Sequence, residues 1–202
     1  MARKIGILGG TFDPPHLGHL TISETCRQHH NLAEVWLIPT DRPPHKKAPL
    51  IEGRHRANML RALVRGLGPF KVNTIELRRS GRSYTLETIS ALKQRFPDEV
   101  FYFIIGSDQI DKLHTWFRVD ELQKLVTFIV VPRPGWDLSQ IAECRKLFSP
   151  ASWKRLQRHV TPVPQMDISS TMIRKKIKAG KPVFHLTGRA VENYILKRGL
   201  YL

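Results

Sequence analysis

The chain has 202 residues, 41% of them hydrophobic, which is enough for one globular domain with its own core. The first residues, MARKIGILGG, hold only a short apolar run, and we expect neither a secretory signal nor a membrane span but a cytoplasmic protein. Lys and Arg total 33 against 17 Asp and Glu, a formal net charge of +16. This excess attracts polyanions, but it is scattered in short groups without zinc-finger spacing and does not favour a nucleic-acid-binding protein.

Cysteine usage says little about function. Cys26 and Cys144 lie far apart in the sequence and form no CxxC pair. We interpret both as reduced thiols, with a disulfide and a zinc cluster as weaker alternatives.

Strand-like and helix-like segments alternate along the chain. Apolar, β-branched runs predict strands at 4–10, 34–40, 70–77, 99–106 and 125–132, and more weakly at 159–164. Helical spacing of apolar residues predicts helices at 19–30, 54–67, 86–96, 120–125, 170–180 and 190–200. The alternation predicts an α/β fold with a doubly wound, mostly parallel sheet, in one domain (1–202) whose helical C-terminal part spans about 165–202.

Ligands bind such sheets beyond the carboxyl ends of the strands. The segments to examine are therefore the loops after the predicted strands: 9–19, 40–47, 106–117, 132–136 and 165–171.

The first of these loops reads GGTFDPPHLGH. Gly9 and Gly10 allow backbone amides to approach a ligand closely, and a helix is expected to start near His16. The N-terminus of that helix offers unpaired N–H groups and a positive dipole, which together form an anion site. His16 and His19, three residues apart, can face the same point, so the loop suits a phosphate group.

Two other interpretations of this loop stay open. Asp13, His16 and His19 could bind a metal, although no HExxH pattern or zinc-like Cys/His spacing accompanies them. The histidines could also be purely structural. The loop matches neither GxGxxG nor GxxxxGK[ST], which disfavours a Rossmann dehydrogenase and a P-loop NTPase.

A second candidate anion site is the stretch ISSTMIR at 168–174. Ser169 and Ser170 are good N-cap residues, and Arg174 follows one helical turn later with a side chain that can bind two phosphate oxygens. Taken alone, the stretch could equally be a Ser-capped basic surface helix.

Together the two stretches resemble the HxGH and ISSTxxR signatures of a nucleotidyltransferase superfamily. Further segments occur in the order found in bacterial nicotinate mononucleotide adenylyltransferases, so the resemblance covers nearly the whole chain: IPTDRPPHK, GRSYTLET, FIIGSDQI, HTWFRVDEL, RPG and RGLYL. It implies a Rossmann-like nucleotidyltransferase fold. It also implies direct transfer of AMP from ATP to nicotinate mononucleotide in NAD synthesis, giving deamido-NAD and pyrophosphate.

The resemblance also assigns residues to ATP. His16, His19 and Arg174 are expected to be catalytic, with His19 nearest the charge that develops at the α-phosphate. The full set expected to bind ATP is Gly9, Gly10, Thr11, Phe12, His16, His19, Gly106, Asp108, Arg133, Ser169, Ser170 and Arg174. Mg²⁺ is expected to arrive bound to ATP, and no protein ligand for a metal is assigned.

For the acceptor, the resemblance implies a nicotinate mononucleotide site formed by Lys46, Tyr84, Thr85, Leu86, Trp116 and Phe117. Trp116 would stack on the pyridine ring, amides near Thr85 and Phe117 would bind its carboxylate, and Lys46 would bind the phosphate. Trp116 and Phe117 could instead be plain core aromatics.

Three functional alternatives remain at this point: preference for nicotinamide mononucleotide, a phosphopantetheine or cytidylyl transfer, and a non-enzymatic nucleic-acid-binding module. We expect ATP and nicotinate mononucleotide as the partners, without nucleic acid or membrane. The oligomeric state is left open.

Overall fold

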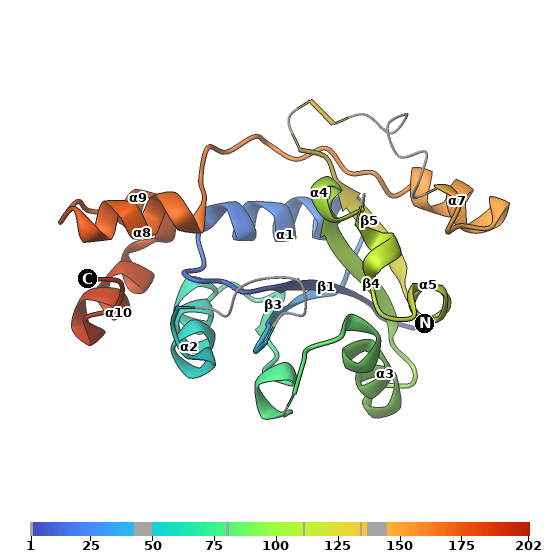
Figure 1. The fold of residues 1–202 in the computed structure, drawn as a ribbon, viewed down its shortest axis with the longest axis horizontal. Helices are drawn as coiled ribbons and strands as arrows, with labels where there is room; N and C mark the ends of the chain where they lie inside the picture. Colours follow the sequence, from blue (N-terminus) through green and yellow to red (C-terminus); the bar gives the residue numbers. More distant parts are fainter. Residues whose placement is uncertain (1, 43–49, 80, 111, 134, 137–144) are drawn as a thin grey trace. The chain divides into compact units, whose positions relative to one another are not determined.

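Near-continuous apolar runs form a five-stranded sheet in the computed structural model, which describes residues 2–42, 50–79, 81–110, 112–133, 135–136 and 145–202. The strands are β1 (Lys4–Gly10), β2 (Glu34–Pro39), β3 (Phe70–Val72), β4 (Val100–Gly106) and β5 (Thr127–Val131). Their order is β3-β2-β1-β4-β5, and β4 pairs in parallel with both β1 and β5 (Figure 1). The predicted parallel α/β sheet is therefore confirmed.

The connections between strands are mainly helical. The longer helices are α1 (Leu17–His29), α2 (Gly53–Leu63), α3 (Thr85–Arg95), α5 (Val119–Leu125), α7 (Pro150–Gln157), α8 (Ser170–Lys178) and α10 (Arg189–Arg198). The single-turn helices are α4 (Ser107–Ile110) and α9 (Phe184–Thr187), and the 3₁₀ turns are η1 (Glu76–Arg78) and η2 (Leu113–Thr115). Within the described ranges, no helix is long and apolar enough to cross a bilayer.

The chain divides into two compact units. Unit 1 comprises Met1–Leu8, Ser23–Val35 and Tyr84–Gln165, and unit 2 comprises Gly9–Ile22, Trp36–Ser83 and Met166–Leu202. Both units are discontinuous in sequence, because the chain crosses from one to the other inside β1, α1 and β2 and again after Ser83 and after Gln165.

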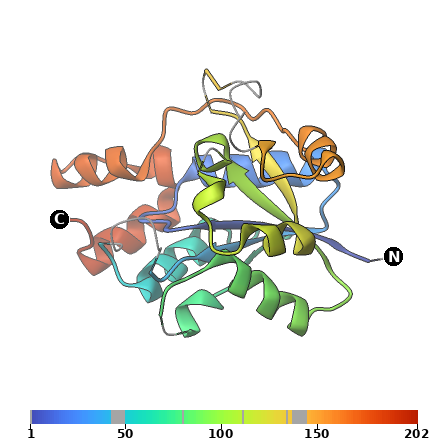
Figure 2. The same ribbon diagram turned by 45° about the vertical axis from the view of Figure 1, so that its right-hand side comes forward.

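Unit 1 is built on β4 and β5, with α3 on one face of the strands and the second half of α1 on the other (Figures 1 and 2). Its core includes Ile5, Phe101, Ile104 and Ile129, all at most 2% exposed. A Cβ atom at Gly6 would lie 2.8 Å from the Leu32 side chain. Glycine therefore lets β1 pack closely on the residues that follow α1.

Unit 2 is held together by its C-terminal helices. α10 packs on α2 and α9 (Figure 1), and α8 and α10 bury apolar residues at helical spacing: Ile173, Ile177, Val191 and Ile195. α10 ends at Gly199, whose φ of 59° lies in the left-handed region that glycine adopts without strain.

Two strand predictions were too long. After Val72 the Asn73 side chain accepts a hydrogen bond from Ile75 N at 3.1 Å, and this local turn ends β3 and leads into η1. At 159–164 the structure has only an isolated bridge between Val160 and Val130, because Pro162 and Pro164 have no N–H to extend a ladder. The helices α4, α7 and α9 were not predicted.

His30, just after α1, should make the stability of the protein depend on pH. Its Nε2 atom lies 2.6 Å from Thr161 Oγ1, and its ring stacks on His159 at 5.0 Å between centroids. Burial, and to a smaller extent the nearby His159, His29 and Lys4, lower the pKa of His30 to about 4. The ordinary pKa of a histidine is about 6.5. When the pH falls below this value, the His30 imidazole is therefore protonated in the unfolded chain but stays neutral in the folded protein.

We expect the free energy of unfolding to fall by about 2 kcal/mol as the pH drops from 6.5 to 4, an amount reduced because the imidazole is only partly buried. Urea denaturation across this range measures it. His30→Gln should flatten that slope, whereas the exposed His185→Gln should not. Equal slopes for His30→Gln and the parent protein would contradict the assignment.

Candidate functional site

The segment Thr11–His19, called here the histidine loop, follows β1 in unit 2. Phe12 has a positive φ of 50° and is 1% exposed, so its ring is turned inward at the start of the loop. A Cβ atom at Gly10 would lie 3.3 Å from that ring. The glycine at the end of β1 thus leaves room for Phe12 beneath the loop.

His16 and His19 lie together at the start of α1, as predicted. Their rings stack with centroids 3.7 Å apart, and the Phe12 ring meets His19 edge-on at 4.8 Å. His16 N donates to His19 Nδ1 at 3.2 Å. Because Nδ1 accepts this bond, a neutral His19 carries its proton on Nε2, so Nε2 is the donor nitrogen of this ring, at the positive end of the helix.

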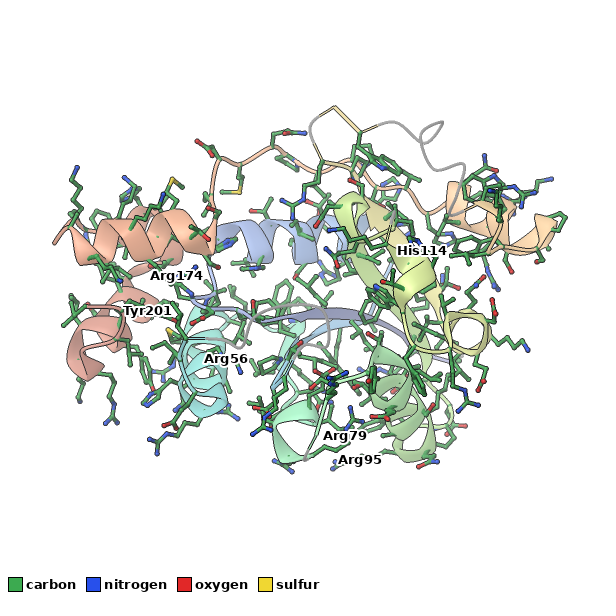
Figure 3. The ribbon with its side chains drawn as sticks, viewed as in Figure 1. Arg56, Arg79, Arg95, His114, Arg174 and Tyr201 are labelled. Carbon is green, nitrogen blue, oxygen red and sulfur yellow. The ribbon has the colours of Figure 1, made fainter. Side chains whose placement is uncertain are left out.

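The second signature is attached to the same loop. Ser169 is the N-cap of α8, and its hydroxyl accepts from Met172 N at 3.2 Å, as the sequence predicted. Ser170 Oγ donates to Pro14 O at 2.8 Å, and Arg174 Nη1 donates to Asp13 O at 2.7 Å. Residues more than 150 positions apart are thus brought together within unit 2; of these, Arg174 is labelled in Figure 3.

The Asp13 carboxylate is already occupied by protein donors. It is 6% exposed; its Oδ1 accepts from the Tyr201 hydroxyl at 2.6 Å, and its Oδ2 accepts from Leu50 N at 2.8 Å. These bonds give Asp13 a structural place in the loop and weigh against the metal interpretation. Among the described residues no group of three or more His, Cys, Asp and Glu could hold a metal ion.

In unit 1, the end of β4 and the segment after β5 form a second polar cluster. Arg133 Nε donates to Asp108 Oδ1 at 2.9 Å, and Arg133 N donates to Ser107 Oγ at 2.9 Å. Burial alone would raise the pKa of Asp108, but hydrogen bonds from Gln109 and Arg133 bring it below its usual value. A Cβ atom at Gly106 would lie 2.6 Å from Asp108 Oδ1, so a larger residue here would displace the Asp108 carboxylate from its present position.

The predicted acceptor residues of unit 1 lie at the start of α3 and around η2. Tyr84 and Phe117 face each other with ring centroids 4.8 Å apart, while Trp116 meets Phe103 edge-on at 5.9 Å. Phe117 is 43% exposed, so it is not a core aromatic. α3 begins at Thr85 without a side-chain cap, and its first N–H groups, including that of Leu86, have the orientation that suits a carboxylate.

Two residues named in the sequence analysis, Lys46 and Cys144, lie outside the described residues. Cys26 is a buried free cysteine, as predicted, and burial raises its thiol pKa to about 12.

Comparison with known proteins assigns the family. The cytidylyltransferase-like family model matches residues 7–176. A protein of Oceanobacillus iheyensis named "Probable nicotinate-nucleotide adenylyltransferase" is 40% identical over 199 residues, covering 98% of this chain and 97% of the relative. The nicotinate-nucleotide adenylyltransferase of Bacillus subtilis (strain 168) is 40% identical over 200 residues, covering 98% of each. The chain belongs to the cytidylyltransferase-like family and, within it, to the nicotinate-nucleotide adenylyltransferases.

The fold agrees with this assignment. Plasmodium falciparum nicotinic acid mononucleotide adenylyltransferase, solved in complex with NaAD, aligns with a TM-score of 0.75 at 22% identity, covering 98% of this chain and 97% of that one. The Rossmann-like nucleotidyltransferase fold predicted from the sequence is confirmed.

Arg56 positions the candidate site, but the sequence analysis did not identify it. Arg56 on α2 is 1% exposed; its Nη1 donates to Thr11 O at 2.6 Å and to Thr40 O at 2.7 Å, and its Nε donates to Ile51 O at 2.9 Å. It thus joins the histidine loop to the loop after β2. The sequence does contain a sign of this role: Arg56 is a charged residue on the apolar face of α2, together with Met59, Leu60 and Leu63.

Arg56→Met should lower the free energy of unfolding by about 3 kcal/mol, since three partly buried carbonyls lose the donor groups of a buried guanidinium. The matched control is Arg61→Met on the exposed side of the same helix, which should change it by less than about 0.5 kcal/mol. Urea denaturation measures both. Equal effects of the two substitutions would contradict this role for Arg56.

Proposed function

We propose that the chain transfers AMP from ATP to nicotinate mononucleotide. An oxygen of the mononucleotide phosphate forms a bond to the α-phosphorus of ATP, the bond from that phosphorus to the bridging oxygen breaks, and pyrophosphate leaves with deamido-NAD as the other product. The observation that carries this proposal is the stacked histidine pair at the start of α1 with Arg174 bonded into the same loop, in a chain of this family. We place the reaction in the cytoplasm, and it requires no nucleic-acid or membrane partner.

The triphosphate is assigned to unit 2. Such a transfer needs no covalent nucleophile from the protein, so catalysis consists of positioning and of stabilising charge in the transition state. His19 Nε2–H would donate to the α-phosphate, and His16 would support it from the adjoining ring. Arg174 with Ser169 and Ser170 at the start of α8 would bind the phosphates that leave as pyrophosphate.

Magnesium enters this proposal as part of the substrate, MgATP. Within the histidine loop itself the one carboxylate is that of Asp13, and it already accepts two hydrogen bonds, whereas His16, His19 and Arg174 supply donors. This donor set suits an ion held by phosphate oxygens and water, which would neutralise the triphosphate.

The adenosine is assigned to two backbone segments and a side-chain pair. Gly9, Gly10, Thr11 and Phe12 would pass along the nucleotide through their backbone. In unit 1, the Asp108 carboxylate, fixed by Arg133, would accept hydrogen bonds from the ribose hydroxyls beside Gly106.

The nicotinate ring is assigned to unit 1. Trp116 would stack on the ring, with the Tyr84 and Phe117 pair beside it. The ring carboxylate would accept hydrogen bonds from Phe117 N and from the N–H groups near Thr85 and Leu86. The start of α3, which has no side-chain cap, favours a negative charge at the latter position. The amide of nicotinamide is neutral and would form only weaker, uncharged hydrogen bonds with these N–H groups. The site therefore favours nicotinate mononucleotide as the substrate.

The acceptor is tested by incubating purified protein with MgATP and either nicotinate or nicotinamide mononucleotide, with 4′-phosphopantetheine as a third acceptor. We expect pyrophosphate release to be fastest with the nicotinate form, by at least about tenfold and with deamido-NAD as the other product, because only that form gains charge-assisted hydrogen bonds from its ring carboxylate. Faster turnover with either other acceptor would overturn the proposed substrate.

His19→Ala should lower kcat by about 100- to 1000-fold, the usual cost of removing one donor to a transition-state charge, while the circular dichroism spectrum stays that of the parent. The matched control is His185→Ala, an exposed imidazole on α9, which should retain full activity. Loss of less than about fivefold in His19→Ala would remove His19 from the mechanism.

A further inference from the structure

The penultimate residue, Tyr201, reaches the histidine loop from the far end of the chain. Tyr201, labelled in Figure 3, is 7% exposed, and its hydroxyl donates to Asp13 Oδ1 at 2.6 Å. Resting on the function proposed above, we propose that Tyr201 is a positioning residue for the triphosphate of ATP, acting through Asp13 on the histidine loop and on Arg174.

The geometry holds Tyr201 firmly in place. α10 ends at Gly199 in the left-handed region, Leu200 N donates to Ile195 O at 3.0 Å, and the Leu200 side chain is buried. The chain therefore turns back after α10 and directs the next side chain inward. Burial, and next the Asp13 carboxylate, raise the pKa of the Tyr201 phenol far above its usual value, so the hydroxyl stays protonated and remains a donor.

Asp13 transmits this constraint in two ways. Its carboxylate is fixed by Tyr201 and by Leu50 N, and its main-chain oxygen accepts from Arg174 Nη1. Pro14 and Pro15, which follow at once, have fixed φ angles and lead directly to His16. A shift of Asp13 would therefore displace both Arg174 and the histidine pair. The predicted acceptor residues that the structure describes, from Tyr84 to Leu86 and Trp116 with Phe117, belong to unit 1 and take no part in this network.

The test is Tyr201→Phe, which removes one oxygen atom and keeps the ring. We expect kcat/KM for ATP to fall about tenfold, with a raised KM for ATP, while KM for nicotinate mononucleotide stays within about twofold. A role in stability alone would lower the amount of active protein and leave both KM values unchanged.

The matched control is Tyr194→Phe, also on α10. Its hydroxyl lies 2.9 Å from His55 Nδ1 and accepts from Asn58 Nδ2 at 3.1 Å, both on α2. We expect both KM values of this variant to match those of the parent. A rise in KM for ATP equal to that of Tyr201→Phe would show a general effect of loosening α10 and overturn the proposal.

Inorganic tripolyphosphate gives a readout that does not need the acceptor. Its dissociation constant, measured by calorimetry, should rise about tenfold in Tyr201→Phe and stay unchanged in Tyr194→Phe. If the parent protein forms no deamido-NAD, the proposed function fails, yet this measurement still decides the role of Tyr201.

A second variant, Asp13→Asn, alters the acceptor of the hydrogen bond from the Tyr201 hydroxyl. It replaces Tyr201→Phe in the test if that variant folds poorly. It should also weaken tripolyphosphate binding, and the double variant should lose less than the product of the two single losses, because both break one contact. Independent, multiplicative losses, or unchanged tripolyphosphate binding in both single variants, would overturn the proposal.

Discussion

A buried carboxylate needs hydrogen-bond donors, and much of unit 2 is arranged around supplying them to Asp13. One donor comes from Tyr201, another from Leu50 after β2, and Arg174 binds the main-chain oxygen of the same residue. The histidine loop is therefore held in place by hydrogen bonds from the C-terminal part of the chain. The buried Arg56 adds a second constraint by tying Thr11 to Thr40. Together, the hydrogen bonds of Asp13 and Arg56 make the histidine loop a rigid part of the fold.

This rigidity accounts for the chemistry that we assign to the loop. Donors that are fixed before the substrate arrives do not have to reorganise as charge develops on the phosphates, which is the main source of electrostatic catalysis. Charge is also concentrated here: residues 170–202 contain eight Lys and Arg against the single acid Glu192. Part of the large positive charge of the chain thus lies in the helices that carry Arg174, where it favours a triphosphate.

The sequence predicted the elements well where a periodic pattern was long. β1, α1 and α8 were placed within one or two residues, because apolar runs, a Gly-Pro turn and a serine cap each leave a local signal. β3 was overestimated because β-branched residues continue past the turn that Asn73 makes. The short helix α9 has too few residues for a period to be seen.

The sequence predicted the two motifs of the candidate site but not the residues that hold them in position. The pairing of ISSTMIR with the histidine loop followed from the resemblance, and the bonds from Ser170 and Arg174 into that loop now give it a physical basis. Arg56 and Tyr201 could not be assigned roles, because what they contact is decided by tertiary packing. A buried arginine on an apolar helix face was a visible anomaly, but the carbonyls that it satisfies are 16 and 45 residues away.

The central claim is that preorganised donors assist a direct transfer, without an intermediate bound to the protein. The stereochemical course at phosphorus tests it most directly. A single diastereomer of adenosine 5′-O-(1-thiotriphosphate) would be used with nicotinate mononucleotide, and the configuration of the thio-substituted deamido-NAD determined by ³¹P nuclear magnetic resonance. The account predicts inversion at the α-phosphorus, the outcome of one in-line displacement. Retention would require two displacements through a covalent intermediate and would contradict it.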